Sequence, residues 1–230
     1  MKYRFLWLAC LCAGGNICAQ QAEETLPYAV NWPSGLGLGE AVVTAQKVKA
    51  PDGAERWRFE LKVDASVPGF TVSDQFRAVA TADYCSVEFE RDLKHGKRAN
   101  RERITFDQEK RSATRETLEG GGKSEFSIPA CAKDPLTFLF FVRRELKQGR
   151  LPAPQPVFFG ASYAVRMESG GAQRLRSGDG MVEADRVIVT FKGPKADQKL
   201  EALFVRDAAR TPALVRLPLA VGTLSVELAR

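Results

Sequence analysis

The chain has 230 residues, of which 44% are hydrophobic and 27% charged, and its formal net charge at neutral pH is +6. This length is enough for one sizeable hydrophobic core, and the composition is that of a globular chain rather than a disordered one. So mild a positive charge, without aromatic residues interleaved among the cations, does not indicate a protein that binds nucleic acid.

The first 19 residues have the organisation of an export signal. Lys2 and Arg4 form a cationic start, and the apolar run Phe5–Ala13 that follows is too short to cross a membrane as a helix. Small residues at the end of this segment offer a signal peptidase a cleavage site. We therefore predict a signal peptide over residues 1–19 and a single β-rich domain over residues 20–230.

A lipoprotein signal is the alternative interpretation, since Cys10, Cys12 and Cys18 are cysteines that could be acylated. Cys10 follows Leu8-Ala9, but Trp7 stands where a small aliphatic residue belongs and the apolar core before it would be too short. Cys12 follows Leu11 and Cys18 follows Ile17, and neither of these residues is small. We therefore expect an exported chain without a lipid anchor, and no transmembrane segment in the mature protein.

The mature chain is dominated by short segments with the period of β-strands. Between Arg56 and Val63, aromatic and aliphatic residues alternate strictly with charged ones, as in a strand with one buried and one wet face. Turn residues such as Asp52-Gly53 separate many of these segments. The predicted strands are Ala41–Val48, Arg56–Val63, Gln75–Thr81, Ser86–Leu93, Arg98–Phe106, Lys110–Thr117, Ser124–Ile128, Val157–Phe159, Ser162–Glu168, Val182–Phe191, Lys199–Val205, Ala213–Leu219 and Thr223–Leu228.

Ahead of the first predicted strand lies the segment Gly35-Leu36-Gly37-Leu38-Gly39, which superficially resembles a phosphate-binding loop. In that kind of loop a strand precedes the glycines and a helix follows them. Here we predict no strand before the glycines and a strand after them, so we interpret the segment as a flexible start to the first strand.

One segment breaks the strand period and predicts a helix. Asp134 supplies a capping oxygen, Pro135 suits the first helical position, and Gly149 ends the segment. Its first two turns are apolar on almost every side, so it cannot lie on a surface. We therefore predict a mainly β fold, a curved antiparallel sheet or open β-barrel wrapped around one central apolar helix.

Two of the five cysteines, Cys85 and Cys131, remain after removal of the signal peptide. In an exported chain two cysteines allow one disulfide and leave no odd thiol. Cys131 lies shortly before the helix and Cys85 at the start of a strand, so the predicted disulfide would fasten the start of the helix to the sheet. Two separate buried thiols are the alternative.

Residues with catalytic or metal-binding chemistry are scarce. The one histidine, His95, lies at a predicted hairpin tip, and we interpret it as an exposed turn residue rather than a base. One histidine and two paired cysteines do not make a zinc site. Glu88, Glu90 and Asp92 share one face of a predicted strand. Such charged residues are typical of a solvent-exposed strand face, so we do not interpret them as a catalytic carboxylate pair. We therefore expect no catalytic residue, no metal and no cofactor.

The densest charge feature of the chain is a run of basic residues around this hairpin. Such a patch could contact the phosphates of lipid head groups or an acidic partner. A solvated hairpin, partly neutralised by neighbouring carboxylates, is the alternative. The basic residues are Lys94, Lys97, Arg98, Arg101 and Arg103.

Several further segments carry a family resemblance. They are Leu26-Pro27-Tyr28, the hairpin from Cys85 to Phe106, Asp134–Leu139, Arg206–Pro212 and Gly222-Thr223. Together they resemble the exported bacterial proteins of domain-of-unknown-function family 3108, over nearly the whole mature chain. The resemblance implies a protein of the Gram-negative envelope, in the periplasm, and provides no established activity or catalytic residues. Its architecture is similar to that of the periplasmic lipoprotein carriers, whose open barrel binds acyl chains.

From these observations we expect a non-enzymatic periplasmic protein whose open β-barrel binds an apolar or lipid-like ligand or an envelope protein. One alternative is a structural or assembly module with a filled barrel and no ligand. The other is a hydrolase that uses carboxylates. Whether the many aromatic residues line a cavity or form a solid core separates the first two.

Overall fold

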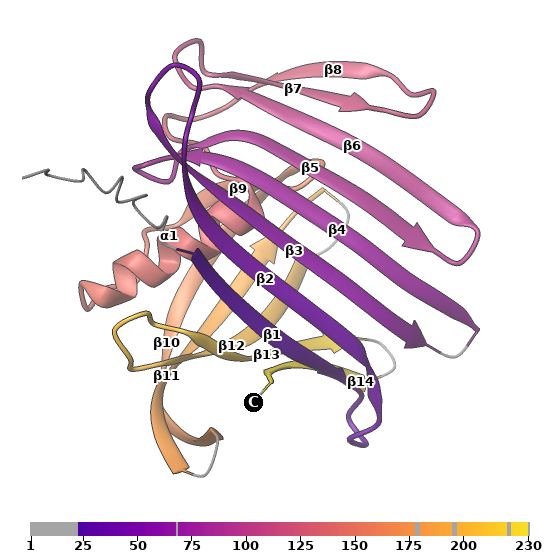
Figure 1. Cartoon of the computed structure of the whole chain (residues 1–230). Helices are drawn as coiled ribbons and strands as arrows, with labels where there is room; N and C mark the ends of the chain where they lie inside the picture. The colour runs from indigo at the N-terminus through magenta and orange to yellow at the C-terminus, as the bar shows by residue number, and fades with distance from the viewer. Residues whose placement is uncertain (1–22, 68, 178–179, 195–196, 220–221, 230) are drawn as a thin grey trace, which may run out of the picture.

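The computed structural model describes residues 23–67, 69–177, 180–194, 197–219 and 222–229. The predicted signal peptide lies outside the described residues. Most of the described residues lie in β-strands. Fourteen strands form one continuous antiparallel sheet that curves around a single helix (Figure 1). The predicted fold class is thus confirmed.

The sheet consists of two halves that the first and last strands join. The N-terminal half comprises β1 (Glu23–Asn31), β2 (Gly37–Lys49), β3 (Glu55–Val67), β4 (Phe70–Thr81), β5 (Ser86–His95), β6 (Arg98–Asp107), β7 (Ser112–Thr117) and β8 (Lys123–Ser127). The C-terminal half comprises β9 (Gln155–Phe158), β10 (Ser162–Ser177), β11 (Gly180–Lys192), β12 (Asp197–Val205), β13 (Pro212–Leu219) and β14 (Gly222–Leu228). Neighbours in the chain pair as hairpins, and β1 pairs with β14, so β8 and β9 are the two edges.

The alternating sequence pattern places one set of side chains on the concave face of the sheet, which we call the inner face. On β2 to β5 the register aligns Ala45, Phe59, Ala78 and Phe89 across this face. All four are buried, and Phe59 is fully so. The intervening charged residues face the other side, as period-two alternation requires.

Helix α1 (Pro135–Lys147) begins as its sequence predicts. The Asp134 carboxylate accepts hydrogen bonds from the backbone N–H groups of Leu136 and Thr137, at 2.9 and 3.0 Å, and Pro135 occupies the first turn. The helix lies between the two halves of the sheet. Its Phe140 packs into the core of the N-terminal half, and Phe138 belongs to a second core cluster with strands of the C-terminal half.

The helix is less enclosed than its composition indicates. Leu139 and Phe141 are only half-buried, because α1 lies toward the end of the curved sheet where β1 begins (Figure 1). The ring of Phe141 is covered by cations, with Lys133 Nζ 4.3 Å and Arg144 Cζ 4.8 Å from its centroid. This side of the first two turns is therefore only partly covered by the rest of the chain.

Ring packing links the two edge strands, and a backbone bridge joins β9 to the segment before the helix. Phe158 of β9 stacks on Phe126 of β8, with ring centroids 5.6 Å apart. The backbone N–H of Phe158 donates to the carbonyl oxygen of Lys133 at 2.9 Å, in the segment that leads into the helix. The sheet therefore forms an open barrel. The chain segment between β8 and β9, which contains α1, closes this barrel along one side.

Every predicted strand overlaps one of β2 to β14, but β1 was not predicted. It was missed because Pro27 interrupts its apolar alternation, and proline argues against a strand.

The expectation that no strand precedes the glycine segment was therefore wrong. Gly37 and Gly39 lie in β2, so a strand rather than a helix follows, as predicted. A Cβ on Gly39 would stand 2.1 Å from the carbonyl oxygen of Asp64, so close approach to β3 requires glycine there.

Candidate functional site

The two mature cysteines come together at the start of the helix. The Sγ atoms of Cys85 and Cys131 lie 2.02 Å apart, the distance of a disulfide. A hydrogen-bond network runs beside them: the hydroxyl of Ser86 donates to the Asp134 carboxylate at 2.5 Å, and so does the hydroxyl of Thr137 at 2.6 Å. The start of α1 is therefore fastened to β5 both by this network and at the cysteine pair.

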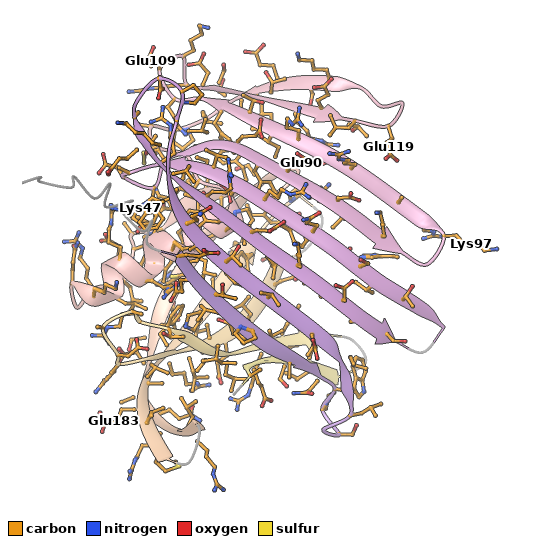
Figure 2. The ribbon with its side chains drawn as sticks, in the orientation of Figure 1. Lys47, Glu90, Lys97, Glu109, Glu119 and Glu183 are labelled. Carbon is orange, nitrogen blue, oxygen red and sulfur yellow. A yellow bond between two sulfur atoms is a disulfide. The ribbon has the colours of Figure 1, made fainter. Side chains whose placement is uncertain are left out.

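The five basic residues of the β5–β6 hairpin do not form one surface. The register sets Arg98 opposite His95 on the inner face, whereas Arg101 and Arg103 stand opposite Asp92 and Glu90 on the outer face. Lys94 is also on the outer face, and Lys97 lies in the turn, at the far tip of the hairpin (Figure 2).

Three of these cations already have partners: Lys94 Nζ lies 4.0 Å from Asp92, and two arginines share Glu90. Arg101 Nη2 lies 2.6 Å from Glu90, and Arg103 Nη2 lies 3.4 Å from the same carboxylate. Burial raises the pKa of Glu90, but hydrogen bonds and charge from the two arginines outweigh it and lower that pKa overall. The arrangement fits the interpretation of a solvated hairpin better than that of an anion-binding patch.

His95 lies at the end of β5, as the predicted hairpin tip requires. Its Nε2 is 3.0 Å from Asp74 of β4, whose other oxygen accepts the backbone N–H of Lys94 at 3.2 Å. These contacts fasten the tip of the β5–β6 hairpin to β4. Figure 1 shows that this tip lies far from the helix.

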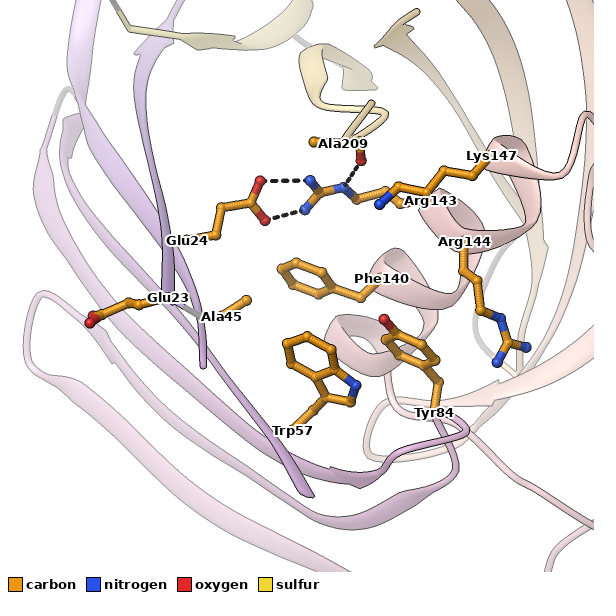
Figure 3. Close-up of a pocket in the computed structure, with 10 residues that line it drawn as sticks. All are labelled: Glu23, Glu24, Ala45, Trp57, Tyr84, Phe140, Arg143, Arg144, Lys147 and Ala209. Atoms are coloured by element: carbon orange, nitrogen blue, oxygen red, sulfur yellow. Dashed lines mark hydrogen bonds and ion pairs between the residues drawn. The ribbon is translucent and has the colours of Figure 1, made fainter. Parts of the chain in front are cut away.

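A pocket with a different composition lies between α1 and the sheet (Figure 3). It encloses about 190 Å³ and is open on one side. Six separate parts of the chain contribute to its walls: β1, β2, β3, the β4–β5 turn, α1 and the β12–β13 turn. The lining residues are Glu23, Glu24, Ala45, Trp57, Tyr84, Phe140, Arg143, Arg144, Lys147 and Ala209.

Aromatic rings form one wall of the pocket. Phe140 of the helix stacks on Phe59 with centroids 4.2 Å apart and planes 8° from parallel. Trp57 and Tyr84 stack beside them, 5.8 Å apart, with planes 19° from parallel. Burial raises the pKa of the Tyr84 hydroxyl, although the charge of Arg144 opposes this, so the hydroxyl is neutral and able to donate at neutral pH.

The wall next to these rings is a face of α1 that carries cations. Phe140, Arg143, Arg144 and Lys147 are spaced by three and four residues, which places them on one side of α1. Arg143 is buried and makes a bidentate pair with Glu24, at 2.7 Å to each carboxylate oxygen, while its Nε donates to the Ala209 carbonyl oxygen at 3.1 Å. A buried guanidinium needs such partners. Arg143 therefore ties α1 to β1 and to the β12–β13 turn.

Sequence reasoning missed this pocket. The spacing of Phe140, Arg143, Arg144 and Lys147 was visible, but cations near the end of a helix are expected simply because they complement its dipole. Trp57 and Glu24 lie on distant strands, and neither belongs to a motif that points to the helix.

Two absences concern the ranges of the chain that the structure describes. In that part of the chain, α1 is too short and too polar to cross a membrane. The same residues contain no group of three or more His, Cys, Asp and Glu side chains arranged to hold a metal ion.

Comparison with known proteins places the chain in a family and a fold. A crystal structure of a beta-barrel-like protein of the domain of unknown function DUF1849, from Brucella abortus, superimposes with a TM-score of 0.59 at 10% identity. The match covers 90% of this chain and 95% of that one, so the likeness shows a shared fold. No curated protein matches in sequence. A family model described as "Protein of unknown function (DUF3108)" matches residues 27–229. The chain therefore belongs to this family of unknown function.

Proposed function

We propose that this chain is a non-catalytic binding protein of the periplasm, which takes an apolar or lipid-like molecule in the pocket beside α1. The observation that carries the proposal is the wall of rings formed by Trp57, Tyr84 and Phe140, with the buried ring of Phe59 stacked behind Phe140. Flat aromatic surface next to an opening is what an apolar ligand requires, and such pockets typically combine it with a few polar groups.

The size of the pocket limits what it can enclose. Ligand pockets usually measure roughly 300–1,000 Å³, and this one is smaller, about 190 Å³. It therefore holds one end of a molecule, and the rest extends through the open side or along the inner face. The inner face offers apolar side chains for this, since Leu61, Val63 and Phe76 point to the interior and are only partly buried.

Native mass spectrometry of the protein purified from the periplasm tests the proposal. A lipid-sized mass should accompany the wild-type chain and should be lost in Trp57→Ala. Trp32→Ala is the matched control, because Trp32 lies in the β1–β2 turn and does not line the pocket. A wild-type protein that carries no ligand, and that takes up none when refolded with envelope lipids, would overturn the proposal and favour a filled structural module.

A further inference from the structure

We propose that the ligand of this pocket is an amphipathic anion, with its carboxylate or phosphate held by Arg144 and Lys147 and its apolar part lying on the rings. This inference rests on the proposed function and specifies the class of ligand. Four cations lie in or beside the pocket, namely Lys47, Arg143, Arg144 and Lys147, whereas its lining contains two carboxylates.

One of these four cations, Arg143, is neutralised by a carboxylate of the pocket. Both oxygens of Glu24 accept hydrogen bonds from Arg143, which is 5% exposed, so this pair is a closed structural unit. Lys147 and Lys47 differ: among the described residues, neither has a carboxylate within 4.0 Å. The pocket therefore has a positive potential that its own acids do not cancel.

Arg144 is only partly neutralised. Its Nε lies 3.3 Å from Glu145, but the other oxygen of that carboxylate lies 2.5 Å from Arg150. A hydrogen bond from Arg150, together with the charges of both arginines, lowers the pKa of Glu145. One negative charge is thus shared between two guanidinium groups, and Arg144 still has donors to offer.

The guanidinium of Arg144 is also held in place for recognition. Its Cζ lies 5.2 Å from the centroid of Tyr84 and 4.8 Å from that of Phe141, so aromatic rings restrain the side chain before any ligand binds. A restrained guanidinium loses less side-chain entropy on binding, and its fork of donors matches a carboxylate or phosphate. The neutral hydroxyl of Tyr84 is a further donor beside it.

The simpler explanation is that these cations only complement the end of the helix. Two carbonyl groups of the last turn already have backbone partners, however, because the N–H groups of Gln148 and Arg150 donate to Glu145 O and that of Gly149 donates to Leu146 O. Lys47 is not on the helix at all; it comes from β2, and its Nζ lies 5.1 Å from the centroid of the Trp57 ring. Cations from two elements converge on one aromatic wall, which helix capping does not explain.

The test is a comparison of four probes on the mature chain by isothermal titration calorimetry, at concentrations below micelle formation. Dodecanoate and dodecyl phosphate carry the anionic group on an apolar chain, dodecyl maltoside is a neutral amphiphile, and inorganic phosphate is the anion alone. We expect the two anionic amphiphiles to bind at least about tenfold more tightly than the maltoside, as charge-assisted hydrogen bonds predict. Inorganic phosphate should bind more weakly than dodecyl phosphate.

Two double variants locate the effect. Arg144→Gln with Lys147→Gln should remove the preference for anions, a loss of about tenfold or more, and should weaken maltoside binding much less. Lys97→Gln with Arg98→Gln removes the same charge at the far hairpin tip and should keep the preference (Figure 2). Lys147→Gln alone, an exposed substitution, should give a smaller loss if the double variant folds poorly.

The other outcomes are equally informative. Equal binding of all three amphiphiles would overturn the anionic part and leave the proposed function standing. Inorganic phosphate binding as tightly as dodecyl phosphate would overturn the amphipathic part. If no amphiphile binds, the proposed function fails together with this inference. An equal loss in both double variants would show a general charge effect and refute the assignment to Arg144 and Lys147.

Discussion

Removing the link between Cys85 and Cys131 should lower stability by an amount that follows from chain length. The two cysteines are separated by 46 residues. In the chain-entropy model, a loop of that size restrains the unfolded chain by about 4 kcal/mol at 25 °C. A compact unfolded state reduces this value, so about 4 kcal/mol is an upper bound for the variant Cys131→Ser.

The fold itself should survive this change. Ser86 and Thr137 still donate to the Asp134 carboxylate, and the N–H of Ser86 donates to the Ala132 carbonyl oxygen at 3.0 Å, so the start of α1 remains attached to β5. The loss should therefore arise mainly in the unfolded state. The slope of unfolding free energy against urea should increase, because the freed chain exposes more surface.

Urea denaturation of the oxidised wild type, Cys131→Ser and the double variant Cys85→Ser with Cys131→Ser measures this. The two variants should have equal midpoints, both well below that of the wild type, and reduced wild type should match them. Thiol titration of the unfolded wild type should find no free cysteine. Two titratable thiols in protein isolated from an oxidising compartment, or variants within about 1 kcal/mol of the oxidised protein, would refute the reasoning.

Three further predictions concern the helix and the outer face. Asp134→Ala removes the helix cap and leaves the buried hydroxyl of Ser86 without its acceptor, so chemical denaturation should show a loss of about 2–4 kcal/mol, whereas an unchanged midpoint would contradict the cap assignment. Phe140→Ala leaves a cavity beside Phe59 and should cost about 3–5 kcal/mol, with Phe140→Leu as the milder control; equal melting temperatures would show that the helix does not fill the core. The pKa of Glu90 is lowered in the folded state, so its stabilising effect is present above its unfolded pKa and is lost as the pH falls through its folded pKa. Stability measured from pH 6 down to pH 3 should therefore fall less steeply in Glu90→Gln than in the wild type, and parallel curves would contradict the ion pairing.

Much of the fold was predictable because the signals that specify it are short-range. The alternation from Arg56 to Val63 indicates a strand wherever it is placed in the molecule, since side chains in extended backbone alternate by geometry. Asp134 and Pro135 likewise mark the start of a helix through contacts within four residues. The one missed strand, β1, contains a proline that weakens its local signal.

The tertiary structure decided which of these residues meet. The basic residues of the β5–β6 hairpin are close together in the sequence and suggest one patch. Strand register instead places Arg98 on the inner face and Arg101 on the outer face, where Arg101 pairs with Glu90. The pocket depends on pairing between distant parts, since Arg143 meets a carboxylate 119 positions earlier in the chain. The sequence by itself determined every strand except β1, the helix and its cap, because local backbone geometry encodes them. Only the closure of β1 on β14 around α1 brought the aromatic wall and the cations together, because strand pairing over such separations is selected by burial of the whole inner face rather than by any local motif.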